Sequence, residues 1–330
     1  MLPLLLRRRF AAALALFALG TVGSACSDDT SDTSSTTSSS SAGGGGTGAG
    51  GTGGGDPGDP IKILNWNIKN FFDDQRDDPN NSNETVLSEA EFQEKVAGVA
   101  AILAELDPDV AILQEIENDR VLDALNTALG NKYPERVSVP GNDPRGVDVA
   151  ALSKTSFSSV VSHKDDQFTL EGTQGPVYTF ARDCVEFHLT HAGQPVVMLG
   201  VHFRSKGPPD DPNKRLAEAQ YVRSIADGLT GANAELGVIV LGDFNDLPGS
   251  DPYDVIAGPE SNRYVDVVDV IPQADRWTFD FMGAKELIDH QMANPTMYGF
   301  VDPASVLIRK GVDVGSVSDH FPIMATYRVR

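Results

Sequence analysis

Cysteine is almost absent from this chain of 330 residues, which contains only Cys26 and Cys184. Two cysteines cannot form the disulfide framework that holds many small exported domains together. Cys184 lies in an alternating stretch, Tyr178–Leu189, and is expected to be a small buried apolar side chain of a strand. The folded part must therefore be stabilised by its own hydrophobic core, and residues 61–330 are numerous enough to form one.

Positive charge is also scarce. The chain has 26 Lys and Arg residues against 47 Asp and Glu residues, and its formal net charge is −21. Phosphate contacts dominate nonspecific binding to nucleic acid, so proteins that bind in this way are usually basic. The composition argues against tight metal-free binding of nucleic acid, but not against its turnover, because bound divalent cations would change the local field.

Long apolar runs are missing except near the start of the chain. Phe10–Leu19 is too short to span a bilayer, follows the basic Arg7–Arg9, and precedes the small residues of Gly23–Cys26. This order predicts a secretion signal over residues 1–26. The end of this segment resembles a bacterial lipobox, so we expect Cys26 to carry lipid. Gly23 departs from the usual pattern, which has an aliphatic residue at that position. The Arg cluster is also compatible with a twin-arginine signal.

Residues 27–60 lack large apolar side chains and consist almost entirely of Ser, Thr, Gly, Asp, Ala and Pro. Such a segment cannot bury a core, so we expect a disordered tether between Cys26 and one folded domain over residues 61–330. An ordinary disordered tail without lipid is the alternative.

Polar residues follow the apolar runs that predict buried strands. Val238–Leu241 is continuous and apolar, and it is followed by Gly242, Asp243 and Asn245. Buried charge is costly unless a metal, a partner or water satisfies it, so this placement indicates a functional cleft. A simple turn is the alternative. The pattern recurs at five further strand ends, which carry Asn67, Glu115, His202, Asp289 and the pair Asp319–His320.

These residues and their order resemble the endonuclease/exonuclease/phosphatase superfamily, which includes deoxyribonuclease I, neutral sphingomyelinases and inositol polyphosphate 5-phosphatases. The resemblance rests on Trp66–Ile68, Gln114–Glu115, Gly242–Asn245 and Ser318–His320, and it covers residues 61–330. The stretches 143–150 and 201–207 are most similar to secreted bacterial members. The resemblance implies a four-layer α/β/β/α sandwich, in which two mixed β-sheets are flanked by helices and loops at the strand ends form one cleft.

The periodicity supports helices that cover a sheet. Ser88 and Glu91 form a capping box ahead of a helix that continues to Leu106, and a second helix is expected over Pro212–Leu229. Each precedes a short buried strand, and residues 133–203 are typical of several strands with turns between them.

The resemblance implies a site for Mg²⁺ or Mn²⁺ with Glu115 as the principal ligand, Asn67 beside it and Asp319 as a further or water-mediated ligand. No cysteine lies near these motifs, which disfavours a thiolate zinc site. A separate acidic loop is a candidate for a structural Ca²⁺, with solvated surface as the alternative; it contains Asp73, Asp74, Asp77 and Asp78.

The resemblance also implies catalytic roles. Asp289 would orient His320 and favour its charged form, and His202 would face the phosphate from the opposite side. Asp243 would position the attacking water, and Asn245 would donate to a nonbridging oxygen. The other histidines are expected to be structural; they are His163, His188, His191 and His290.

Four basic residues are candidates for holding phosphate, with exposed solvated bases as the alternative. They are Arg145, Arg182, Arg204 and Lys206, of which Arg145 and Lys206 border motifs.

The leading functional hypothesis is a monomeric, divalent-metal-dependent phosphoester hydrolase at the cell envelope, acting like an endonuclease on extracellular nucleic acid. The alternatives are a sphingomyelinase-like lipid phosphodiesterase, a phosphomonoesterase and an inactive surface binding module. The choice among substrates depends on loops outside the motifs.

Overall fold

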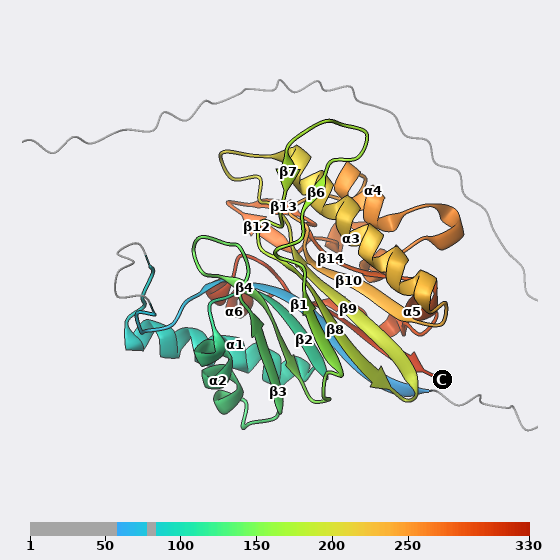
Figure 1. Cartoon of the computed structure of the whole chain (residues 1–330). Helices are drawn as coiled ribbons and strands as arrows, with labels where there is room; N and C mark the ends of the chain where they lie inside the picture. Colours follow the sequence, from blue (N-terminus) through green and yellow to red (C-terminus); the bar gives the residue numbers. More distant parts are fainter. Residues whose placement is uncertain (1–57, 78–83) are drawn as a thin grey trace, which may run out of the picture. The chain divides into compact units, whose positions relative to one another are not determined.

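The computed structural model describes residues 58–77 and 84–330 (Figure 1). The expected signal, the Cys26 that is expected to carry lipid, nearly all of the expected tether and Asp78 lie outside the described residues. Strand β1 (Asp59–Phe71) begins two residues before the domain start expected at residue 61. Within the described ranges, no helix has the length and apolar character that crossing a membrane requires.

One six-stranded sheet contains both β1 and the last strand of the chain. Its order is β15 (Leu307–Ile308), β16 (Ile323–Val329), β1, β2 (Val110–Ile116), β4 (Asp148–Ser153) and β3 (Glu135–Val139). Strands β1 and β2 run parallel, whereas the other neighbours are antiparallel.

The second six-stranded sheet holds the strand before Asp243. Its order is β11 (Val265–Asp266), β14 (Asp289–Ala293), β10 (Gly237–Asp243), β9 (Gln194–His202), β8 (Cys184–His191) and β5 (Ser159–Ser162). Only β9 and β10 pair in parallel in this sheet. Two mixed sheets are therefore present, as predicted.

Alternation along β1 shows how the layers form. Leu64 and Trp66 join the apolar cluster that includes helices α1 (Glu89–Leu106) and α2 (Asp119–Ala128), whereas Ile61 and Ile63 join the core between the two sheets. A strand presents successive side chains to opposite faces, so one strand serves both cores.

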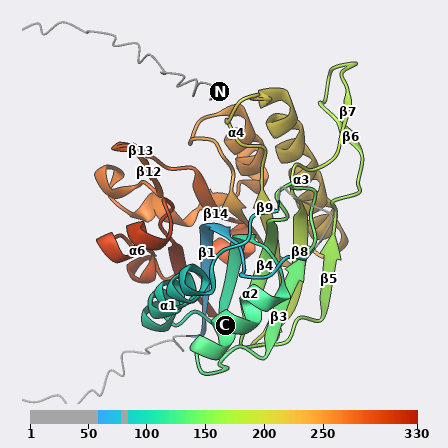
Figure 2. The same ribbon diagram turned by 90° about the vertical axis from the view of Figure 1, so that its left-hand side faces the viewer.

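Helices on the far face of the second sheet complete the four layers. Helices α3 (Pro212–Ala232) and α4 (Asp251–Ala257) pack on this sheet through a third apolar cluster, on the opposite side of the molecule from α1 and α2 (Figures 1 and 2). The four-layer prediction is confirmed.

Shorter elements are the helices α5 (Pro295–Tyr298) and α6 (Val312–Val317), the hairpins β6 (Phe168–Thr169) with β7 (Val177–Tyr178) and β12 (Phe279–Phe281) with β13 (Ala284–Glu286), and the 3₁₀ turns at 260–262, 267–270, 273–275 and 303–305.

Two local predictions are confirmed and one is wrong. The capping box of Ser88 and Glu91 begins α1, and Cys184 is buried with a free thiol. The single strand predicted over Tyr178–Leu189 is broken, because β7 ends at Tyr178 and β8 begins at Cys184. The intervening loop carries Arg182 toward the cleft, a role that a regular strand would not provide.

Candidate active site

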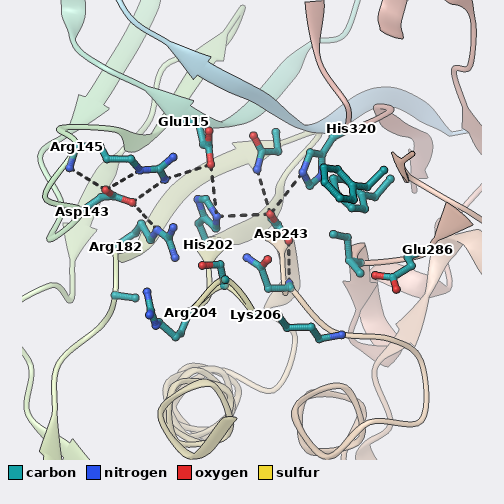
Figure 3. Close-up of a pocket in the computed structure, with 18 of the residues that line it drawn as sticks. Glu115, Asp143, Arg145, Arg182, His202, Arg204, Lys206, Asp243, Glu286 and His320 are labelled. Carbon is teal, nitrogen blue, oxygen red and sulfur yellow. Dashed lines mark hydrogen bonds and ion pairs between the residues drawn. The ribbon is translucent and has the colours of Figure 1, made fainter. Parts of the chain in front are cut away.

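The strand ends of both sheets open into one cleft of about 720 Å³ (Figure 3). Ten of the predicted site residues line it: Asn67, Glu115, Arg145, Arg182, His202, Arg204, Lys206, Asp243, Asn245 and His320. Asp289 lies directly behind His320. Asp319 does not line this cleft, although its Oδ1 lies 4.0 Å from Nε2 of the cleft residue His320.

Glu115 faces the cleft because of an irregularity in β2. It adopts a left-handed backbone conformation with φ of 65°, at the point where the pairing of β2 with β4 shifts register. Such a bulge re-aims a side chain, and a non-glycine residue is held there only at a cost. The backbone N–H of Asn70 donates to Glu115 Oε2 at 2.7 Å and so fixes the carboxylate in this orientation.

A chain of ion pairs connects Glu115 with two of the predicted phosphate ligands. Arg145 Nη2 lies 3.3 Å from Glu115 Oε1 and 2.8 Å from Asp143 Oδ2, and Arg182 Nε donates to the same oxygen of Asp143 at 2.7 Å. Burial opposes ionisation of Asp143, but its bonds to Arg145 and the charge of Arg182 lower its pKa below the ordinary value. Asp143 thus fixes both guanidinium groups beside the cleft.

Asp243 occupies the centre of the site, where three predicted residues meet it. Its Oδ2 accepts from Asn67 Nδ2 at 3.0 Å and lies 3.5 Å from His202 Nε2 and 3.9 Å from His320 Nε2 (Figure 3). Burial, followed by repulsion from Asp289, raises the pKa of Asp243 to about 6. Near neutral pH it is a carboxylate whose basicity exceeds that of an exposed aspartate.

His320 is held in a fixed orientation by Asp289. His320 Nδ1 and Asp289 Oδ2 are 2.9 Å apart, and the Phe279 ring packs on the imidazole with 4.8 Å between centroids. Burial alone would lower the pKa of His320, but the charge and hydrogen bond of Asp289 raise it to about 9. His320 is therefore a cation near neutral pH, with Nε2 directed toward Asp243.

His202 differs from His320 in protonation. It is buried at the end of β9, and burial followed by the charges of Arg182 and Arg145 holds the pKa of His202 well below its usual value. Its Nε2 lies 4.0 Å from Glu115 Oε1. The cleft thus has a neutral imidazole and a charged one on either side of Asp243, an arrangement typical of divided acid and base roles.

Asp319 lies between Lys69 and His320. Its Oδ2 forms an ion pair of 2.6 Å with Lys69 Nζ, and its Oδ1 lies 4.0 Å from His320 Nε2. The structure therefore brings Asn67 and Glu115 to the cleft but places Asp319 on its outer side, against a lysine that the sequence did not single out.

The remaining predicted ligands have protein partners. Asn245 Nδ2 donates to the Phe203 carbonyl at 3.1 Å, and its backbone N–H donates to Asp243 Oδ1 at 2.8 Å. Lys206 Nζ lies 3.2 Å from Asp246 Oδ1. Both side chains still line the cleft, and Lys206 remains exposed to an incoming anion.

Three of the four histidines expected to be structural contact carboxylates outside the cleft. His290 is buried and bonded to Asp266 at 2.7 Å, and His163 and His188 both contact Glu186. Near the predicted Ca²⁺ loop, Asp77, Glu84 and Glu117 bring carboxylate oxygens within 4.8 Å of one another.

The donor set fits a hard divalent cation. Glu115 lines the cleft with a carboxylate that also pairs with Arg145, and carboxylate and amide oxygens are the ligands that Mg²⁺ and Mn²⁺ accept. Asp243, Asp289 and His320 also have ligand atoms within 4.8 Å of one another. His320 is protonated near neutral pH and bonded to Asp289, however, so a metal there would have to displace that proton. Glu115 could hold a cation without that displacement.

The residues of this region that were not predicted include Asp143, Lys69 and Phe279. Asp143 lies in a stretch that carries the family resemblance, and its position two residues before Arg145 is a signal that could have identified it. Lys69 follows Asn67 in a bulge of β1, where its φ is 49°. Phe279 belongs to a hairpin with no motif, and only tertiary structure places it against His320.

Comparison with known proteins agrees with this geometry. The model of the Endonuclease/Exonuclease/phosphatase family matches residues 64–320. No curated protein matched the sequence.

Solved structures share the fold at low sequence identity. Truncated TDP2 of Caenorhabditis elegans has a TM-score of 0.54 and 18% identity, over 82% of this chain and 98% of that one. The human Nocturnin catalytic domain with bound sulfate has a TM-score of 0.57 and 16% identity, over 81% and 93%. TDP2 of D. rerio complexed with a single-strand DNA product has a TM-score of 0.51 and 18% identity, over 81% and 98%. The family match covers well over half of the sequence, so this chain belongs to the Endonuclease/Exonuclease/phosphatase family and is a metal-dependent phosphoester hydrolase.

Proposed function

We propose that this enzyme is a Mg²⁺- or Mn²⁺-dependent phosphodiesterase that cleaves extracellular nucleic acid at the cell envelope. The observation that carries the proposal is the position of Asp243, which lies within 4 Å of a neutral histidine, His202, and a charged one, His320, beside the open carboxylate of Glu115. Phosphodiester cleavage needs an oriented water, charge neutralisation and a proton for the leaving oxygen, and these groups offer all three.

Each residue has a role that its environment supports. Glu115 and Asn67 would hold the cation, which when bound neutralises charge on the phosphoryl oxygens. Asp243, a carboxylate near neutral pH, orients the attacking water by accepting its proton in a hydrogen bond. His320 is charged and donates from Nε2 to an oxygen of the substrate, while Asp289 keeps the imidazole in place. His202 acts as a neutral hydrogen-bond donor from the other wall.

The basic residues support a substrate with more than one phosphate. Arg145, Arg204 and Lys206 line the cleft beyond the central group, where neighbouring phosphates of a chain would lie. The DNA product bound by the structurally similar TDP2 of D. rerio supports a nucleic acid for this cleft. The strongly negative net charge implies that the cation and this local basic group overcome the repulsion of a polyanion.

A substrate panel tests the proposal. The purified full-length chain would be assayed with Mg²⁺ or Mn²⁺ against single-stranded DNA, plasmid DNA, RNA, sphingomyelin and a phosphomonoester. We expect the highest kcat/KM for a nucleic acid. A higher value for sphingomyelin or for the phosphomonoester would transfer the assignment to a lipid phosphodiesterase or a phosphatase, and no turnover of any substrate would leave a binding module.

The envelope location is supported by the sequence alone, through the signal-like residues 1–26 and the lipobox-like end at Cys26. Cys26→Ser should move the protein from the membrane fraction to the soluble fraction without altering its turnover number. Unchanged membrane association of this variant would contradict lipid anchoring, and unchanged turnover serves as the control for folding.

A further inference from the structure

A single buried carboxylate connects two loops of the cleft. Glu218 lies on α3, is 0% exposed, and does not line the cleft itself. Its Oε1 accepts from the backbone N–H of Ala181 at 2.6 Å, and its Oε2 accepts from the backbone N–H of Arg204 at 2.7 Å. One loop follows β7 and the other follows β9, so Glu218 links segments that no strand pairing holds together at this point.

Both linked loops carry arginines of the site. Arg182 directly follows Ala181, and Figure 3 shows Arg182 and Arg204 on the wall of the cleft away from His320. Arg182 Nη1 donates to the Phe203 carbonyl at 3.0 Å, which ties the two loops a second time.

The same face of α3 holds both backbone polar groups of Arg204. Glu218 accepts its N–H, while Arg215, one helical turn earlier, donates from Nη1 to its carbonyl at 3.1 Å. Residues three apart lie on one face of a helix, so the two side chains act on one peptide segment. The backbone of Arg204 is therefore fixed from both sides, whereas its side chain reaches the cleft.

A carboxylate at this position is not explained by stability alone. The buried residues of α3 include Ala217, Ala219 and Val222 as well as Arg215, and burial raises the pKa of Glu218 to about 7. An uncompensated buried acid is costly, and well-packed apolar groups often serve a core equally well. What an apolar side chain could not do is accept two backbone N–H groups from two separate loops.

We propose that Glu218 is a positioning residue for binding of substrate phosphate. It acts by fixing the spacing between the loops that carry Arg182 and Arg204. The inference rests on the proposed phosphodiesterase function and adds the residue that arranges the phosphate-binding wall. Arginines that hold non-reacting phosphates contribute equally to ground state and transition state, so their displacement changes KM rather than kcat.

Glu218→Gln tests the inference, because it keeps the size of the side chain but turns an –NH₂ group toward one of the two N–H donors. We expect KM for a single-stranded DNA oligonucleotide to rise at least about fivefold, the scale for losing one ordinary hydrogen bond, with kcat changed less than about twofold. The dissociation constant for inorganic phosphate, measured in Mg²⁺, should rise by a similar factor.

Arg223→Gln is the matched control. Arg223 is also buried on α3, but it donates to the carbonyls of Ile256, Ala257 and Asn262, away from the cleft. This variant should lose thermal stability and keep the wild-type KM. An equal rise of KM in both variants, or an unchanged KM and phosphate affinity in Glu218→Gln, would overturn the inference.

Two further measurements keep the test independent of the proposed function and of the folding of one variant. Glu218→Gln combined with Arg204→Ala should raise KM by less than the product of the single effects, whereas a full product would separate Glu218 from Arg204. In the wild-type protein, the Ala181 and Arg204 amides should be protected from hydrogen exchange, and rapid exchange of both would refute the link. If the wild-type chain hydrolyses no phosphoester, the proposed function fails, and phosphate affinity together with exchange still decides the role of Glu218.

Discussion

Asp289 and His320 form a buried hydrogen-bonded pair, with 2.9 Å between Asp289 Oδ2 and His320 Nδ1, that joins the start of β14 to the segment before β16. The second oxygen of Asp289 has no hydrogen-bond partner. Burying a carboxylate is costly unless a partner compensates its charge, and the imidazole of His320 is that partner here. The pair also determines which end of the ring, Nε2, is presented to Asp243.

The first prediction follows from this pairing. His320→Ala should lower kcat at least about 10²-fold, the usual scale for loss of a proton-transfer or electrostatic group. Asp289→Asn should act through His320, so the double variant should lose little beyond His320→Ala. The measurement is kcat for the four proteins, with thermal midpoints as the control for folding. Strictly multiplicative losses would exclude the pairing from the mechanism.

The second prediction concerns stability and pH. The folded-state pKa of His320 is raised to about 9 from an ordinary value of 6.5, so the folded protein holds this proton more tightly than the unfolded chain. The resulting stabilisation, on the order of 3 kcal/mol, is fully present below pH 6.5 and is lost as pH rises through 9.

Wild type and His320→Asn compared in chelator isolate this contribution. The advantage of the wild type in free energy of unfolding should be largest near pH 6.5 and should shrink steadily toward pH 9. The window above pH 6.5 also lies beyond the raised pKa of Asp243, which is about 6. A difference that stays constant over this range would show that His320 is not charged in the fold.

The third prediction concerns the contact between the sheets. Asn65 is fully buried, donates to the carbonyls of Gly242 at 3.3 Å and His290 at 3.2 Å, and accepts from Gln114 Nε2 at 2.9 Å. Asn65→Ala removes all three hydrogen bonds and leaves their partners unsatisfied, so it should lower the free energy of unfolding by about 2–4 kcal/mol.

Gln93→Ala, an exposed change on α1, should stay within about 0.5 kcal/mol of the wild type and is the control. Denaturant unfolding of the three proteins measures both effects. Equal midpoints for wild type and Asn65→Ala would show that the sheets are joined by apolar packing alone.

The sequence predicts the layers well because each buried strand and each capped helix is encoded locally. Alternation in β1 and the capping box at Ser88 are properties of a few adjacent residues, and the four-layer architecture follows from the family motifs. Helix α2 was not predicted, although Asn118 caps it. It has only ten residues and begins soon after the strand that ends in Glu115, so the motif of that strand drew the interpretation of this stretch. The loop before Cys184 was not predicted either, because its alternation continues through residues that do not pair.

The site is predictable where a residue type identifies its chemistry and less so where a contact depends on distant segments. Glu115 and Asp243 follow apolar runs, so their burial at a cleft could be expected. The bulge that turns Glu115 into the cleft, the ion pair of Asp319 with Lys69 and the hydrogen bonds of Glu218 depend on partners 14 to 250 residues away or on backbone geometry. A motif can identify a catalytic or metal-binding residue. Only the fold shows which atoms of that residue face the substrate and which neighbours hold it in place.

The central claim is that a divalent cation held by Glu115 is required for phosphoester hydrolysis in this cleft, and one titration tests it. Initial rates on single-stranded DNA would be measured in EDTA and over a Mg²⁺ series for wild type, Glu115→Gln and the control Glu94→Gln, which alters an exposed carboxylate of α1 that does not line the cleft. We expect no hydrolysis in EDTA, full recovery with Mg²⁺, a half-saturating Mg²⁺ concentration at least about tenfold higher for Glu115→Gln, and wild-type behaviour for Glu94→Gln. Full activity of the wild type in excess chelator, or an unchanged Mg²⁺ requirement in Glu115→Gln, would contradict it.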